Sequence, residues 1–106
     1  MTLKTFVFFD SSSTGSESNV MEVLERSEDM TLHVTGSGSV NLKVMGKADL
    51  QDGDWEDIAV ISLESFGVSQ SITDTGIYCV PLRGLTRLKI VNSGASGVKV
   101  YGRIMA

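Results

Sequence analysis

The stretch MTLHVTGSGSVNLKV, residues 30–44, decides the fold class. Apolar side chains recur there at every second position, at Met30, Leu32, Val34, Val40, Leu42 and Val44. A period of two is that of a β-strand with one face turned toward a core. The GSGS segment at 36–39 is typical of a tight turn. We therefore predict two antiparallel strands joined as a hairpin.

The same alternation continues along most of the chain. It is cleanest near the C-terminus, where Val98, Val100, Gly102 and Ile104 share one face. Further strands are predicted at 3–9, 55–64, 69–73, 76–82 and 85–91. Residues 19–26 fit either a helix or a weak alternation, and we favour a strand there. About eight short strands between glycine-containing turns predict an all-β sandwich or barrel. Its predicted inward residues are Leu32, Val34, Val40, Leu42, Val44, Ile58, Val60, Leu88, Ile90, Val98, Val100 and Ile104.

Size and composition indicate one folded domain. A chain of 106 residues has the length of a single domain, which we assign to 1–106 with a Ser-rich loop at 10–19. The net charge is −4 and the nine Lys and Arg are scattered, so nucleic acid is excluded as a partner. No apolar run reaches the roughly 18 residues of a membrane span, and the N-terminus lacks a signal-peptide pattern. We therefore predict a cytoplasmic site of assembly and no membrane partner.

The segment DLQDGDWED, residues 49–57, has three possible uses. An EF-hand loop starting at Asp52 fails, because Asp57 stands where glycine is required and Leu63 where glutamate is required. A less regular calcium site remains open, with candidate ligands Asp49, Asp52, Asp54 and Asp57. A hairpin turn at Asp52–Gly53 explains the segment better, since carboxylates at a loop tip stay solvated. We predict no cofactor and no metal.

The sequence gives no support for catalysis. Its only histidine, His33, lies on the polar side of a Thr-rich strand, which favours a surface role over a general base. Its only cysteine, Cys79, has no electropositive neighbours and is predicted to be a small buried residue of a strand. One histidine and one cysteine are too few for a zinc site. We predict that the protein is not an enzyme.

Apolar and aromatic residues suggest contacts with other molecules. The run Phe6, Val7, Phe8, Phe9 would make a strand apolar on both faces, which implies cover from a second chain in a homo-oligomer. Aromatic residues are enriched at interfaces, so Trp55 and Tyr101 join this run as interface candidates. An aromatic platform could be formed by Trp55, Phe66, Tyr78 and Tyr101. The alternative for each aromatic residue is packing in the core.

The C-terminal half contains a succession of turn and strand signals: an Asp-Gly loop with a tryptophan, an apolar strand, a Gly-x-Tyr segment and two final strands. Its residues are Asp52, Gly53, Trp55, Ile58 to Leu63, Gly76, Tyr78, Gly84, Arg87 to Val91 and Val98 to Ile104. This succession resembles small jelly-roll-like sandwich proteins and modules of tailed-phage virions. Carbohydrate-binding modules share a similar outline, so that class remains open.

The resemblance implies an all-β, antiparallel, jelly-roll-like β-sandwich of about eight strands. It also implies an architectural function, as a capsid decoration or head-surface protein or as a tail or adaptor piece. The implied partners are further copies of the chain, as a trimer, and a larger viral protein shell or tail proteins. The implied location is the virion, assembled in the host cytoplasm. The alternative is a carbohydrate-binding module of a phage tail or fibre, with Trp55 or Tyr101 stacking on a glycan and calcium at 49–57.

Overall fold

The computed structural model describes residues 3–10, 17–23, 29–36, 39–48, 55–94 and 97–105. These residues form strands and connections and contain no helix. The strands are β1 (Leu3–Phe9), β2 (Met21–Glu22), β3 (Asp29–Gly36), β4 (Leu42–Lys47), β5 (Glu56–Asp57), β6 (Val60–Ser62), β7 (Val68–Ser69), β8 (Gly76–Pro81), β9 (Arg87–Asn92) and β10 (Val98–Met105). The predicted all-β class is confirmed, and in the segment 19–26 the described residues 21–22 form a strand.

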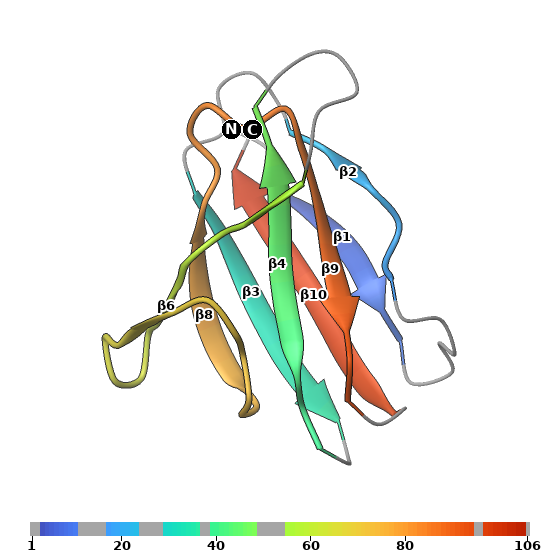
Figure 1. The fold of residues 1–106 in the computed structure, drawn as a ribbon, viewed down its shortest axis with the longest axis vertical. Coiled ribbons are helices and arrows are strands. Elements are labelled where there is room, and N and C mark those ends of the chain that lie inside the picture. The colour runs from blue at the N-terminus through green and yellow to red at the C-terminus, as the bar shows by residue number, and fades with distance from the viewer. Residues whose placement is uncertain are drawn as a thin grey trace.

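The strands build two antiparallel sheets that pack face to face (Figure 1). One sheet has six strands in the order β1-β10-β3-β8-β6-β7, and the other has four in the order β2-β9-β4-β5. The first strand, β1, pairs with the last, β10. The pairs β2–β9, β3–β8 and β4–β5 are nested inside this pair along the sequence. Eight strands paired in this way, rolled into two sheets, have the connectivity of a jelly roll. The two additional strands, β6 and β7, extend the six-stranded sheet beyond β8.

The predicted hairpin at residues 30–44 is wrong. Strand β3 pairs with β10 and β8, whereas β4 pairs with β9 and β5 in the opposite sheet. The connection between them therefore crosses from one sheet to the other. The single strand predicted at 55–64 is also wrong, because β5 and β6 lie in different sheets and the chain crosses at Ile58 and Ala59. Both connections are polar or short, and such segments suit a crossing as well as a hairpin.

The core lies between the two sheets and follows the alternation of the strands. Ten of the twelve predicted inward residues are buried, and Val40 and Ile58 are half-buried against them. The core also contains Met30, the first residue of the alternating set at 30–44, and residues that were not predicted to face inward, namely Phe8, Phe9, Met21, Ile72, Val80 and Leu82. Ile72 reaches the core from a loop, where its backbone exchanges two hydrogen bonds with Leu42.

Strand β1 contains a β-bulge, which turns neighbouring side chains of its apolar run toward the same face of the sheet. Val7 pairs with Tyr101 and Phe9 with Val100, so the register shifts between them. A bulge adds one residue to a strand and lets neighbouring side chains turn to the same side. Phe8 and Phe9 are consequently both buried, with 4% and 3% of their surface exposed. The apolar run therefore supplies this chain's own core, and no second chain is needed to cover these two rings.

Candidate functional site

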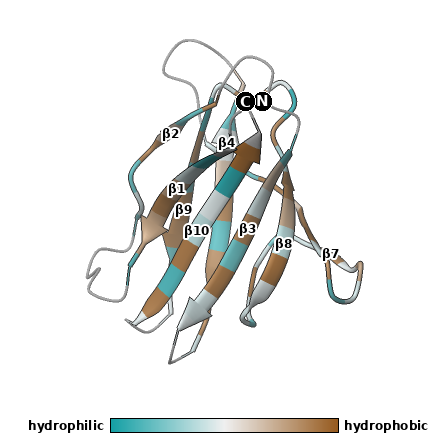
Figure 2. Ribbon diagram, turned by 180° about the vertical axis from the view of Figure 1, so that it is seen from behind, coloured by the Kyte–Doolittle hydropathy of each residue, from teal (hydrophilic) through white to brown (hydrophobic). Residues whose placement is uncertain are grey.

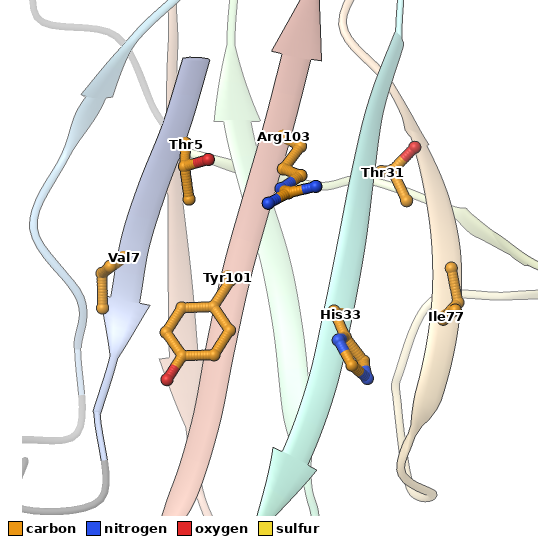
Figure 3. A pocket seen from close by; sticks show the side chains of 7 residues that line it. All are labelled: Thr5, Val7, Thr31, His33, Ile77, Tyr101 and Arg103. Carbon is orange, nitrogen blue, oxygen red and sulfur yellow. The ribbon is translucent and has the colours of Figure 1, made fainter. Parts of the chain in front are cut away.

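The outer face of the six-stranded sheet carries a groove that runs across β1, β10, β3 and β8. Figure 2 views this face, where hydrophobic and hydrophilic bands alternate along β10 and β3. The groove has a volume of about 530 Å³, within the size range of small-molecule sites. Its lining side chains, shown in Figure 3, are Thr5, Val7, Thr31, His33, Ile77, Tyr101 and Arg103.

Strand register arranges these side chains in two neighbouring rows. One row is partly apolar, and its members pair in the order Val7, Tyr101, His33 and Ile77. The other row is polar, with Arg103 between Thr5 and Thr31. Residues two positions apart on a strand are separated by about 7 Å, so the rows run side by side at that spacing. The groove thus offers an aromatic ring and a cation to one ligand.

The lining of the groove contains no carboxylate, although the chain as a whole has a net charge of −4. Arg103 is exposed, and its guanidinium has no ion pair or hydrogen bond with the part of the chain that the structure describes. The ion pairs of Lys43, Arg87 and Lys89 all lie in the four-stranded sheet. The lining of the groove therefore presents one permanent cation and no carboxylate, on a protein that is acidic overall.

A second exposed feature is the hairpin between β6 and β7, which projects beyond β8 in Figures 1 and 2. Three apolar side chains of this hairpin are exposed: Leu63 (43%), Phe66 (77%) and Val68 (68%). Phe66 has a φ of 59°, in the left-handed region, which is unfavourable for a residue with a large side chain. We call Leu63, Phe66 and Val68 the apolar hairpin.

Hydrogen bonds hold the tip of this hairpin in place. The Phe66 N–H donates to the carbonyl oxygen of Ser62 at 2.7 Å, and the Ser62 N–H donates to the carbonyl of Gly67 at 2.9 Å. The Gly67 N–H donates to Oγ of Ser65 at 3.3 Å. The turn therefore fixes the backbone of Phe66 with its ring in solvent. Sequence reasoning considered Phe66 only as one of four aromatic residues, because no residue pattern signals a left-handed phenylalanine.

The four aromatic candidates do not form one platform. Tyr101 lies in the groove, Phe66 in the apolar hairpin, and Tyr78 is half-buried, with its hydroxyl donating to the carbonyl of Asp74 at 2.7 Å. Trp55 lies at the four-stranded sheet, where its ring is 5.2 Å from Nζ of Lys47 and 4.6 Å from Nζ of Lys89. These contacts make Trp55 a packing partner for two lysines of that sheet.

Of the calcium candidates, Asp49, Asp52 and Asp54 lie outside the described residues. The fourth, Asp57, forms an ion pair with Nζ of Lys43 at 3.8 Å. Within the described ranges, no group of three or more His, Cys, Asp or Glu side chains is placed to hold a metal ion.

The histidine and the cysteine lie on the same outer face. His33 is exposed in the groove, as the Thr-rich strand predicted. Cys79 is half-buried in β8 rather than fully buried, because it pairs with Thr31 on this face and not with the core. Desolvation raises the pKa of the Cys79 thiol, and the charge of Asp29 raises it further. A raised pKa keeps the thiol protonated at neutral pH, which is unfavourable for a nucleophile.

The remaining interface candidates belong to β1. Phe6 is half-buried and packs against the core with its ring centroid 4.8 Å from that of Phe8. Val7 is 47% exposed and lines the groove. Of the predicted interface residues, Val7 and Tyr101 thus line the groove, together with Ile77 and Arg103, which were not among them.

Comparisons with known proteins identify the fold. No protein-family model and no curated protein sequence matches the chain. The solved structure of YomS, an SPBc2 prophage-derived protein, is similar with a TM-score of 0.85 at 19% identity, over 99% of this chain and 94% of YomS. The structure of XepA, a PBSX exported protein, is similar with a TM-score of 0.85 at 16% identity. That match covers 97% of this chain, which spans 37% of XepA.

The described part of the chain contains no helix of the length and hydropathy needed to cross a bilayer.

Proposed function

We propose that this protein is a non-catalytic structural component of a tailed phage, which forms a homo-oligomer and binds a larger protein shell as a capsid decoration or head-surface protein. The observation that carries the proposal is the apolar hairpin. Phe66 exposes 77% of its surface from a backbone conformation that a phenylalanine rarely adopts. A strained, solvent-exposed aromatic residue is typical of a functional contact.

The energetics of the hairpin suit binding to a folded protein. Aromatic residues with large buried area dominate the energy of protein interfaces. The hydrogen bonds at Ser62 and Ser65 fix the turn before any partner arrives, so less conformational entropy is lost on association. The left-handed φ of Phe66 costs roughly 1–2 kcal/mol. Burial of the ring in a partner's pocket offsets that cost, since a buried Phe contributes about 1.5–3 kcal/mol.

Two further observations support the proposal. Both similar structures are proteins of prophages, SPBc2 and PBSX, and share the fold of this chain. The thiol of Cys79 has a raised pKa and His33 is exposed on an open sheet face, which supports a protein that binds rather than catalyses.

Self-association tests the oligomer. Light scattering of the pure protein at micromolar concentration is expected to give a multiple of the 11.4 kDa chain, with a trimer expected. Phe66→Ser is expected to lower the mass or weaken association. Val20→Ser is the matched control, because Val20 is 45% exposed outside the hairpin. A compact wild-type monomer at these concentrations would refute the oligomer, and equal effects of the two substitutions would refute the role of the hairpin.

Mass spectrometry of purified particles tests the location. The chain is expected to be present at a fixed ratio to the major shell protein of the phage that encodes it. Its absence from washed particles would contradict the structural role.

A second candidate is a carbohydrate-binding module, for which the groove is the specific observation. Tyr101 lies in the groove with threonine hydroxyls in the adjacent row, which is the mixture of apolar surface and hydrogen-bonding groups that a polar ligand requires. Saturable chemical-shift changes at the groove on addition of an oligosaccharide would favour this function.

A further inference from the structure

We propose that the groove binds an oligosaccharide bearing negatively charged groups, with Tyr101 contacting a sugar ring and Arg103 binding the anionic substituent. The proposal deepens the second candidate function and rests on it. Its basis is the juxtaposition in Figure 3 of an aromatic side chain and a guanidinium on neighbouring rows of one sheet face.

The positive charge of Arg103 favours an anionic ligand. Arg103 has no ion pair with the described residues, and its neighbours across the strands, Thr5 and Thr31, are neutral hydroxyl donors. A guanidinium presents a planar fork of N–H donors that matches a carboxylate or phosphate. No carboxylate is among the side chains that line the groove, so a bound anion contacts no acidic side chain of the lining. An anionic ligand is therefore complementary to the groove even though the chain is acidic overall.

The position of the groove on a sheet face favours a sugar over an extended peptide as the ligand. The groove lies on the face of β1, β10, β3 and β8, whose backbones already pair with one another. A peptide cannot add as a strand on this face, because strand addition takes place at the edge of a sheet and the groove lies across its face. A face instead offers side chains: the ring of Tyr101 for the apolar side of a sugar, and hydroxyl and imidazole groups for its polar edge.

The dimensions agree with a short chain of sugars. Four strands span about 14 Å from the first to the last, at the usual spacing between neighbouring strands. Tyr101 and Arg103 lie two residues apart on β10, which separates them by about 7 Å along the strand. A ligand with a ring over Tyr101 therefore places a charged substituent, on the same or the next sugar, near Arg103.

Titration by NMR or calorimetry tests the proposal with defined probes. Trigalacturonate supplies carboxylates, its methyl ester is the neutral match, and a phosphorylated trisaccharide and inorganic phosphate separate the possible sources of charge. Trigalacturonate or the phosphorylated trisaccharide is expected to bind saturably, at least about tenfold more tightly than the ester, with weakening by salt. Equal affinity for the ester, or no saturable binding of either charged sugar, would overturn the proposal. Binding of inorganic phosphate or hexaglutamate as tightly as the charged sugars would overturn it too, because the groove would then recognise charge alone.

Matched variants locate the contacts. Arg103→Gln is expected to abolish the preference for the charged probe, and Tyr101→Ala to weaken both the charged and the neutral sugar about tenfold or more. Arg83→Gln and Val20→Ala remove an arginine and an exposed apolar side chain outside both the groove and the apolar hairpin and are expected to leave binding unchanged. The light-scattering mass of the same samples reports the structural proposal separately, so failure of sugar binding is distinguishable from failure of assembly. If the control variants lowered affinity as much as the groove variants, the assignment of the site would be wrong.

Discussion

Replacing Gly102 by alanine tests the packing of the bulged strand against the core. Gly102 lies on β10, opposite Phe6 of β1 and Leu32 of β3, and is buried. A Cβ at this position would overlap Sδ of Met30 and come within 2.9 Å of Cε2 of Phe8. Met30 is fully buried and Phe8 is 4% exposed, so neither side chain can move into solvent to make room.

The expected cost follows from two opposing terms. Overpacking a well-packed core costs about 1–3 kcal/mol. Replacing glycine by alanine recovers about 0.4–1 kcal/mol, because the unfolded chain has less freedom to lose. Gly102→Ala is therefore expected to lower the free energy of unfolding by about 1–2 kcal/mol. For a domain of this size, that corresponds to a fall in Tm of roughly 5–15 °C.

Urea denaturation measures the effect, as a lower midpoint at an unchanged m-value. Gly67→Ala is the control, because a Cβ there meets only Oγ of Ser65 at 3.4 Å; its effect is expected to stay within about 0.5 kcal/mol. Shortening Met30 to alanine makes room for the new methyl group. The double variant is expected to be more stable than the sum of the two single changes predicts, by about 1 kcal/mol or more. Strict additivity, or a neutral Gly102→Ala, would refute the close approach of Met30 and Phe8 to this glycine.

Three further predictions concern single side chains. Because the pKa of Cys79 is raised, iodoacetamide is expected to alkylate it more slowly at neutral pH than a cysteine in a short unstructured peptide. Desolvation, Asp74 and Glu64 raise the pKa of Tyr78; the folded state therefore holds the phenolic proton when the unfolded state has lost it. The free energy of unfolding should then fall as pH rises from about 10 through the raised pKa, and Tyr78→Phe should reduce that fall in urea titrations. Trp55→Leu removes both lysine contacts and is expected to cost roughly 1–2 kcal/mol in the same assay, with a change near zero contradicting that role.

The inward residues were predictable because a strand has a strict period of two. Once Val98 faces the core, Val100 and Ile104 must do so as well, and all three are buried. Phe8 and Phe9 break this period, since a bulge depends on the pairing of β1 with a strand about ninety positions away. Alternation along one segment carries no information on that pairing.

The connections were less predictable than the strands. Gly and Ser residues at 36–39 favour a change of direction, but a hairpin and a crossing between sheets use the same residues. Which one forms depends on whether β3 and β4 pair with each other or with other strands. In this fold β3 lies between β10 and β8, and both of its edges are already occupied.

The groove could not be derived from the sequence for a related reason. Its residues come from β1, β3, β8 and β10, and their neighbourhood exists only through the register of four strands. Tyr101 was a candidate because it is aromatic, whereas Arg103 looks like any solvated strand residue until Thr5 and Thr31 are seen beside it. Phe66 was equally inconspicuous, since its exposure follows from the turn at Ser62 and Gly67.

The two exposed features lie on the same sheet but are suited to different ligands. The apolar hairpin extends β6 and β7 past the eight-stranded jelly roll, so it is an addition to the fold rather than part of its core. The groove, in contrast, consists of outward side chains on β1, β10, β3 and β8, which can change without altering the alternation that forms the core. Separate placement means that substitutions at Phe66 and at Arg103 should act independently, because residues without shared contacts have additive effects. The proposed assembly contact and the proposed sugar contact can therefore coexist on one small domain, and a variant lacking one should retain the other.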